Sequence, residues 1–276
     1  MNPVDHILSG PIFKGKNAWK WQAAIIATLL VFLLVSYFAE PLREMYEIAS
    51  INTFPNAQRA FDFGERHFSS SAGDAYNVDL ADYFFAKAQA MDPSLEYVDH
   101  ERARVAFIRG QFDTALKLID RQIAAHGTST PNSYYVRGLI EGYMGRYDAA
   151  AKDYSHYLGH DLRNWAGLND YAWILIKAKR FNEAAGVAAY GLQSWPENPW
   201  LLNSYAIASS ELGHNSIALE AITMANTEVL SVNTDQWLRA YPGNDPRIAT
   251  EGIDTLARSI EQNFRAISDA AQKNNK

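Results

Sequence analysis

The sequence predicts an all-α protein, a solenoid of antiparallel helix pairs preceded by one N-terminal transmembrane helix. Two observations support this prediction. A turn-and-helix pattern returns every 34 or 35 residues through the middle of the chain, and a long uncharged apolar run lies near the N-terminus. A repeat with a period of about 20 to 50 residues is typical of solenoids, and about 20 consecutive apolar residues are enough to cross a bilayer as a helix.

The apolar run extends from Trp21 to Ala39 without a charged side chain. At about 1.5 Å per residue, a helix of this length covers roughly the hydrocarbon thickness. A cleaved signal peptide is the alternative, but its apolar region is usually only about 7 to 15 residues long. Its cleavage site also needs small residues, whereas Tyr37-Phe38-Ala39 contains bulky aromatic ones. We therefore expect an uncleaved single-pass transmembrane helix over residues 21–39.

The charges on either side of this run predict its orientation. Lys14, Lys16 and Lys20 precede the run, whereas Glu40, Arg43, Glu44 and Glu47 follow it. Because positive charge is retained on the cytoplasmic side, residues 1–20 should be cytoplasmic. The chain after the run, beginning with a juxtamembrane linker over 40–54, should be extracytoplasmic, and periplasmic if the source is bacterial.

The repeat appears as four copies of one turn-and-helix-start pattern. The copies are Gly110-Gln-Phe-Asp-Thr-Ala115, Gly145-Arg-Tyr-Asp-Ala-Ala150, Lys179-Arg-Phe-Asn-Glu-Ala184 and Gly213-His-Asn-Ser-Ile-Ala218. Ala81 continues the series of final alanines towards the N-terminus. The turn should reverse the chain between two helices and bury its aromatic ring beneath them.

A second series of small residues lies twelve positions before four of these alanines, at Ala103, Gly138, Ala172 and Ala206. A small residue on each of two adjacent helices lets their axes approach closely. Pro93 and Pro196 lie twelve residues after an alanine of the first series, where a proline would end the second helix.

These residues resemble the tetratricopeptide repeat (TPR) family, whose unit of about 34 residues has this pair of small residues, this Gly-x-aromatic turn and this terminal proline. The resemblance covers roughly residues 55–227. It implies a right-handed superhelix of about four to five helix pairs, in which the first helices line a groove that usually binds peptides. Several positions depart from the family pattern: Lys179 replaces the turn glycine, Asn215 replaces the turn aromatic, and Gly127, Leu162 and Leu230 stand where proline is usual.

The first and last elements are irregular. The first pair should consist of Pro55–His67 and Asp79–Met91, separated by a loop around Ser69–Gly73. Residues 228–271 should form a degenerate half-repeat and a capping helix, because the last repeat of a solenoid needs a cover. The apolar stripe of that helix is Ile253, Leu256, Ala257, Ile260, Phe264 and Ile267, and residues 272–276 should form a polar tail.

Composition excludes several kinds of chemistry. A net charge of −6 disfavours nucleic acid, because phosphate binding needs a basic face. There is no cysteine for a disulfide, a catalytic thiolate or a cysteine zinc site. His156 and His160 have ligand spacing, but no glutamate stands between them as in a zinc peptidase, so we expect an exposed pair and no metal.

No phosphate-binding loop or nucleophile motif is present. The carboxylates Glu101, Glu141, Glu183 and Glu220 should belong to the solvated face. We therefore expect a protein that is not an enzyme, with no cofactor and no small-molecule substrate. An active site assembled only in space is the remaining enzymatic alternative.

The resemblance to TPR proteins also predicts which side chains face the groove. Tyr135 and Trp173 should face it because they lie off the packed stripe, whereas Tyr134, Tyr171 and Tyr205 should be core. A clamp for a C-terminal carboxylate is not expected, because cationic groove residues are sparse. The full set of groove candidates is His100, Arg104, Phe107, Tyr135, Leu139, Tyr143, Asn169, Trp173, Lys177, Asn203 and Ile207.

These features predict a membrane-tethered scaffold or adaptor that binds a partner protein or peptide in the groove. Envelope assembly, secretion and pilus biogenesis are processes in which such a protein would act. The alternative is a constitutive structural subunit of a membrane complex, which would use the convex face or the transmembrane helix instead.

Overall fold

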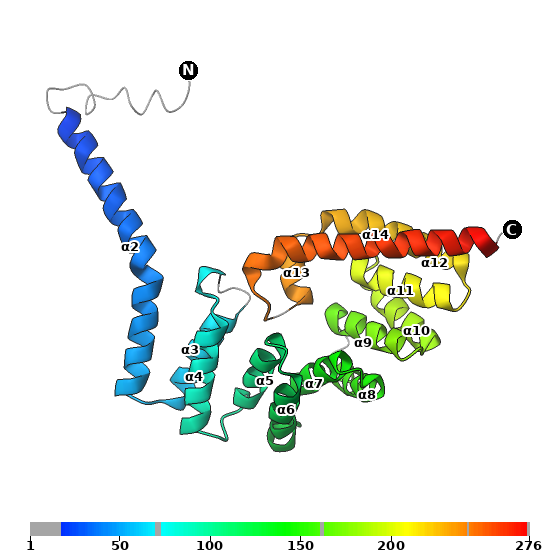
Figure 1. The fold of residues 1–276 in the computed structure, drawn as a ribbon, viewed down its shortest axis with the longest axis horizontal. Helices are drawn as coiled ribbons and strands as arrows, with labels where there is room; N and C mark the ends of the chain where they lie inside the picture. Colours follow the sequence, from blue (N-terminus) through cyan, green and yellow to red (C-terminus); the bar gives the residue numbers. More distant parts are fainter. Residues whose placement is uncertain (1–17, 70–72, 161–162, 242, 275–276) are drawn as a thin grey trace. The chain divides into compact units, whose positions relative to one another are not determined.

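The computed structural model describes residues 18–69, 73–160, 163–241 and 243–274 (Figure 1). Lys14 and Lys16, which contributed to the predicted orientation, lie outside the described residues. The chain divides into two units, Met1–Pro55 and Asn56–Lys276. All the regular secondary structure in the described ranges is helical, as predicted.

The first unit contains one long helix, α2 (Ala18–Thr53). It is the single helix among the described residues that is long and apolar enough to cross a membrane. The residues expected to form a juxtamembrane linker, 40–54, are almost entirely helical, because α2 continues through Pro41 to Thr53. Proline removes only one backbone donor, whereas each further residue of an established helix adds a hydrogen bond.

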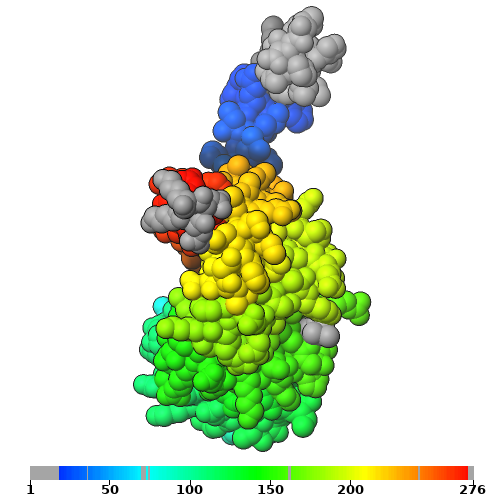
Figure 2. Space-filling model, turned by 90° about the vertical axis from the view of Figure 1, so that its right-hand side faces the viewer, coloured from blue at the N-terminus to red at the C-terminus, as the bar shows by residue number. Residues whose placement is uncertain are grey.

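The second unit contains five helix pairs followed by a C-terminal cap. The first two pairs are α3 (Ala57–Phe68) with α4 (Val78–Met91) and α5 (Val98–Ile108) with α6 (Phe112–His126). The next three are α7 (Asn132–Tyr143) with α8 (Tyr147–Leu158), α9 (Trp165–Lys177) with α10 (Phe181–Leu192), and α11 (Pro199–Glu211) with α12 (Asn215–Glu228). Figure 2 shows later pairs stacked on earlier ones, from green to yellow.

The two series of small residues lie where the helices pack most closely. Ala81, Ala115, Ala150, Ala184 and Ala218 are completely buried. So are the second-series alanines Ala103, Ala172 and Ala206. A Cβ atom added at Gly138 would lie only 3.0 Å from the Tyr154 ring, so any larger residue would require this buried ring to shift. The predicted register of the repeat is therefore confirmed.

The turn between the two helices of a pair requires a left-handed residue. Gly110, Gly145 and Gly213 have φ angles of 70°, 75° and 77°, and Lys179 adopts the same conformation with φ 59°. Glycine enters this region without steric cost, whereas a residue with a Cβ does not. The third of these turns therefore has the conformation of the others, with local strain at Lys179.

The C-terminal region differs from a sixth pair. A short helix α13 (Thr234–Ala240) leads to the 3-10 helix η4 (Pro246–Ile248) and then to α14 (Ala249–Asn274). Ile260 and Ile267 of α14 are buried in a cluster with Ala221 and Ile222 of α12, so α14 packs against the last helix pair. The predicted tail is wrong in part, because α14 continues to Asn274.

Candidate binding cavity

The second unit contains a partly open cavity of about 780 Å³. Its walls come mainly from the first helices of the first four pairs, α3, α5, α7 and α9, together with Tyr157 of α8 and residues 239–241 and 244. Figure 1 shows α13 and the start of α14 on the open side of the arc that the pairs form. The groove predicted from the repeat is therefore present, but the C-terminal region of the same chain covers part of it.

Residues 239–241 and 243–248, here termed the closing segment, are attached at two places. The Tyr76 hydroxyl donates a 2.6 Å hydrogen bond to the carbonyl of Gly243. Trp200 Nε1 donates to the Tyr241 hydroxyl at 3.1 Å. The segment thus connects the loop before α4 with α11. The sequence did not predict this position.

Eight of the eleven groove candidates line the cavity, and three do not. Lys177 is exposed, with Nζ 5.7 Å from the centre of the Trp173 ring. Asn203 accepts a 2.9 Å hydrogen bond from Asn263 of α14, and Ile207 is half-buried on the same helix, α11. The prediction is wrong for α11 because α14 packs against it. The eight that line the cavity are His100, Arg104, Phe107, Tyr135, Leu139, Tyr143, Asn169 and Trp173.

Tyr135 does not lie off the packed stripe, as the sequence suggested. Its ring meets the rings of Tyr154 and Tyr157 at centre-to-centre distances of 5.5 and 5.3 Å, within the packing between successive helices. Its hydroxyl donates a 2.6 Å hydrogen bond to Asp170 Oδ2. Tyr135 is therefore both a core residue and part of the cavity wall, because a tyrosine ring is long enough to be buried at its base and polar at its tip.

The three tyrosines expected in the core lie there, whereas Trp173 lines the cavity but also packs against buried core residues, so it does not lie off the packed stripe. Tyr134, Tyr171 and Tyr205 are partly buried against the hydrophobic core. The Trp173 ring lies 6.0 Å from that of Tyr143 at the cavity. Tyr143 itself is 59% exposed, although it belongs to the same lining. These rings form an aromatic wall on α7 and α9.

Carboxylates in the cavity were missed or misplaced by sequence reasoning. Glu101 is only 5% exposed, so its assignment to the solvated face is wrong. It accepts a hydrogen bond from Arg104 Nη1 at 2.5 Å. Helix α5 carries polar residues all around its circumference, so apolar periodicity could not identify its buried face. Glu141 is also half-buried, whereas Glu183 and Glu220 are exposed as predicted.

Burial shifts the pKa values of two carboxylates and one histidine that line the cavity. It raises the pKa of Asp170 to about 6, against hydrogen bonds from Tyr135 and Asn169 that favour the charged form. Burial, assisted by the charge of Glu101, raises the pKa of Glu65 to about 7. The pKa of His100 falls to about 4 because burial disfavours the imidazolium. His100 is therefore neutral at physiological pH, and its Nδ1 lies 3.0 Å from Ser133 Oγ.

The histidine pair lies outside the cavity. His156 and His160 are exposed, and their ring centres lie 5.3 Å apart. The ring centre of His156 also lies 4.0 Å from that of Tyr134. Across the described ranges, no three His, Asp or Glu side chains are placed to hold a metal ion. Nothing in the geometry of this pair assigns it a role.

Comparison with known proteins identifies the fold. No protein-family model matches the sequence, and no curated protein matches it. The crystal structure of YrrB, described as a TPR protein with an unusual peptide-binding site, matches with a TM-score of 0.55 at 15% identity. The match covers 66% of this chain and 91% of YrrB.

Structures of MamA match similarly. One has a TM-score of 0.54 at 14% identity and covers 63% of this chain and 92% of MamA. Another has a TM-score of 0.55 at 19% identity, with coverage of 63% and 99%. At these identities the similarity shows the fold alone. The chain therefore has a TPR-like solenoid fold of paired antiparallel helices.

Proposed function

We propose that this chain is a membrane-tethered adaptor whose cavity holds a short segment of a partner protein outside the cytoplasm. TPR folds mediate binding between proteins or to peptides, and this function needs no catalytic group. Envelope assembly, secretion and pilus biogenesis are the settings that we propose for it.

The observation that carries the proposal is the aromatic cavity. Its volume of about 780 Å³ lies within the roughly 300 to 1,000 Å³ that ligand pockets occupy. Tyrosine and tryptophan are the residues that most often dominate binding energy at interfaces, and Tyr143 and Trp173 are available for that role. Because the closing segment covers part of the groove, we expect the occupant to be a few residues long rather than an extended peptide.

The surface of α2 supports the membrane tether. Phe32 and Val35, for example, are 67% and 64% exposed, and no part of the described chain covers the apolar window of this helix. A lipid environment would remove these side chains from water. In the sequence, Lys14, Lys16 and Lys20 precede the apolar run whereas Arg43 follows it, and this excess of basic residues favours a cytoplasmic N-terminus.

Site-specific photocrosslinking in intact cells tests the binding proposal. A photoreactive amino acid replaces Leu139, which lines the cavity, and in a control chain it replaces Glu220, which is exposed on α12. We expect a discrete protein adduct from position 139 and none from position 220. Adducts from position 220 alone would support the structural-subunit alternative, in which the outer face makes the contact.

A fusion protein tests the tether and its orientation. A reporter that is active only outside the cytoplasm should work when fused after Lys276, and the intact chain should remain with the membrane after alkaline washing. Release by the wash would indicate a cleaved leader. Activity of a cytoplasmic reporter at the same position would contradict the orientation.

A further inference from the structure

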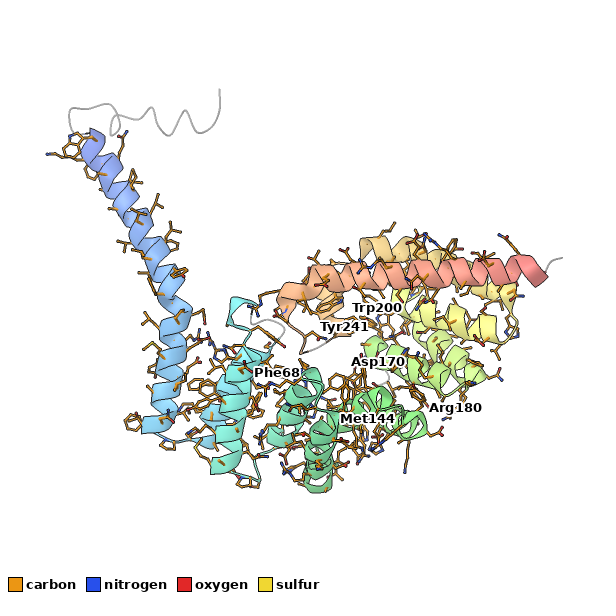
Figure 3. The ribbon with its side chains drawn as sticks, in the orientation of Figure 1. Phe68, Met144, Asp170, Arg180, Trp200 and Tyr241 are labelled. Atoms are coloured by element: carbon orange, nitrogen blue, oxygen red, sulfur yellow. The ribbon has the colours of Figure 1, made fainter. Side chains whose placement is uncertain are left out.

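We propose that the cavity recognises an arginine side chain of the partner segment, held by the carboxylate of Asp170 against the rings of Tyr143 and Trp173. The inference rests on the proposed function and adds the chemistry of the bound residue. Figure 3 shows Asp170 and Tyr241 close together, between α9 and the closing segment.

The carboxylate of Asp170 is incompletely paired. Its carboxylate accepts a short hydrogen bond from Tyr135 and a weak one, 3.5 Å long, from Asn169 Nδ2. An ionised carboxylate offers about four acceptor sites, so about two remain. Within the part of the chain that the structure describes, no cationic side chain pairs with Asp170. A carboxylate that is enclosed without a cationic partner is costly, and a ligand cation would supply that partner.

The two arginines of the lining are not placed to neutralise Asp170. Glu65, Glu101 and Asp170 line the cavity together with Arg104 and Arg239. The guanidinium of Arg104 is already engaged by Glu101, and Arg239 is exposed on α13. Neither arginine neutralises Asp170, so the cavity is complementary to an additional positive charge.

An aromatic surface lines the cavity together with Asp170. The centre of the Tyr143 ring lies 5.1 Å from that of Phe107 and 6.0 Å from that of Trp173. More than half of the surface of Tyr143 is nevertheless exposed. Burial and the charge of Asp170 both raise the pKa of Tyr143, so the ring lies within the field of this carboxylate and remains neutral. A neutral aromatic face attracts a cation within about 6 Å of its centre. Lys177 already lies at this distance from Trp173.

A carboxylate next to an aromatic surface favours arginine over lysine as the bound residue. A guanidinium is planar, stacks on aromatic faces and donates two parallel hydrogen bonds to one carboxylate. An ammonium group is a compact, strongly hydrated charge that loses more on entering an aromatic cavity. The cavity volume also suits one long side chain with its flanking backbone better than a run of bulky residues.

Blocked peptides test the inference on the full-length chain in detergent micelles. Four N-acetylated, C-amidated pentapeptides carry Arg, Lys, Gln or Glu between Gly-Ala and Ala-Gly, and thermophoresis measures their affinities up to about 5 mM, in the range of weak single-residue contacts. We expect the Arg peptide to bind most tightly, the Lys peptide more weakly, and the other two not at all. Equal binding of the Arg and Gln peptides would overturn the inference, as would no binding of the Arg peptide.

Variants locate the site. Asp170→Asn and Tyr143→Leu should each weaken the Arg peptide about tenfold or more, because each removes one of the two attractive groups. The matched control Asp254→Asn makes the same chemical change at an exposed position of α14 and should bind like the wild type. Lys177→Met should leave binding unchanged or strengthen it. A folded Asp170→Asn chain with wild-type affinity would refute the role of Asp170.

The crosslinking experiment separates this inference from the proposed function. An adduct from position 139 that survives both Asp170→Asn and Tyr143→Leu would show that the cavity holds a partner by other contacts, so the inference alone would fail. Absence of any adduct from the wild-type chain would remove the proposed function itself. If Asp170→Asn does not fold, Tyr143→Leu and the comparison of peptides on the wild-type chain decide the outcome.

Discussion

Replacing Asp170 by asparagine should make the unliganded protein more stable while it weakens binding. The carboxylate is enclosed at the cavity, and burial raises its pKa from 3.8 to about 6. Asparagine has nearly the same shape as the protonated acid and can still accept the hydrogen bond that Tyr135 donates. The variant therefore removes the cost of enclosing a charge and retains most of the packing.

The size and pH dependence of the effect follow from the pKa. A shift of about 2 units corresponds to roughly 3 kcal/mol between the charged and neutral forms, and we expect a gain of about 1 to 3 kcal/mol because asparagine is an imperfect copy of the acid. The folded-state pKa lies above the unfolded value. The stability that protonation confers is therefore complete below about pH 3.8 and is lost as the pH rises through about 6. The advantage of the variant should follow that loss, being full at pH 7.5 and absent near pH 4.

Urea unfolding of the full-length chain in detergent, followed by tryptophan fluorescence at several pH values, measures the difference between the two proteins. Burial also raises the pKa of Glu65 and of Glu141 to about 7, but both groups are present in both proteins and their contributions cancel to first order. A variant that is less stable than the wild type at pH 7.5 would refute the reasoning. So would a difference that does not change with pH.

Three further substitutions test the fold and the closing segment. Lys179→Gly should raise stability by about 1 kcal/mol and the melting temperature by roughly 2 to 4 °C, because Lys179 has φ 59°; an unchanged melt would argue against strain there. Ala172→Trp should lower stability by about 1 to 3 kcal/mol or more, since Ala172 is fully buried; an unchanged melt would contradict the register. Tyr76→Phe should speed hydrogen exchange in residues 243–248 by removing its bond to Gly243, whereas equal exchange would show that the segment does not depend on this bond.

The repeat architecture could be predicted because its determinants are local. Each helix pair packs mainly on its neighbours, so close packing at Ala103, Gly138, Ala172 and Ala206 leaves a regular trace in the sequence. The apolar run that became α2 is equally visible. The full length of α2 could not be predicted, because a linker and a helical extension with one proline have similar composition.

Much of the groove could also be predicted, because the first helices repeat in register. His100, Tyr135 and Asn169 recur at this spacing and all reach the cavity. Asn203 continues the series, but α14 covers it. The register defines which face of a helix turns inward, and it contains no information on which other segment occupies that face.

The closing segment and the charge of the cavity were decided by tertiary structure alone. Tyr76 and Gly243 meet across 167 positions of sequence, and no periodic pattern relates residues so far apart. Asp170 lies beside the predicted Asn169, but its enclosure depends on Tyr135 from the preceding pair and on the closing segment. Sequence by itself determined the local units and their order, because their packing repeats. The depth and chemistry of the cavity depend on contacts that occur only once in the fold.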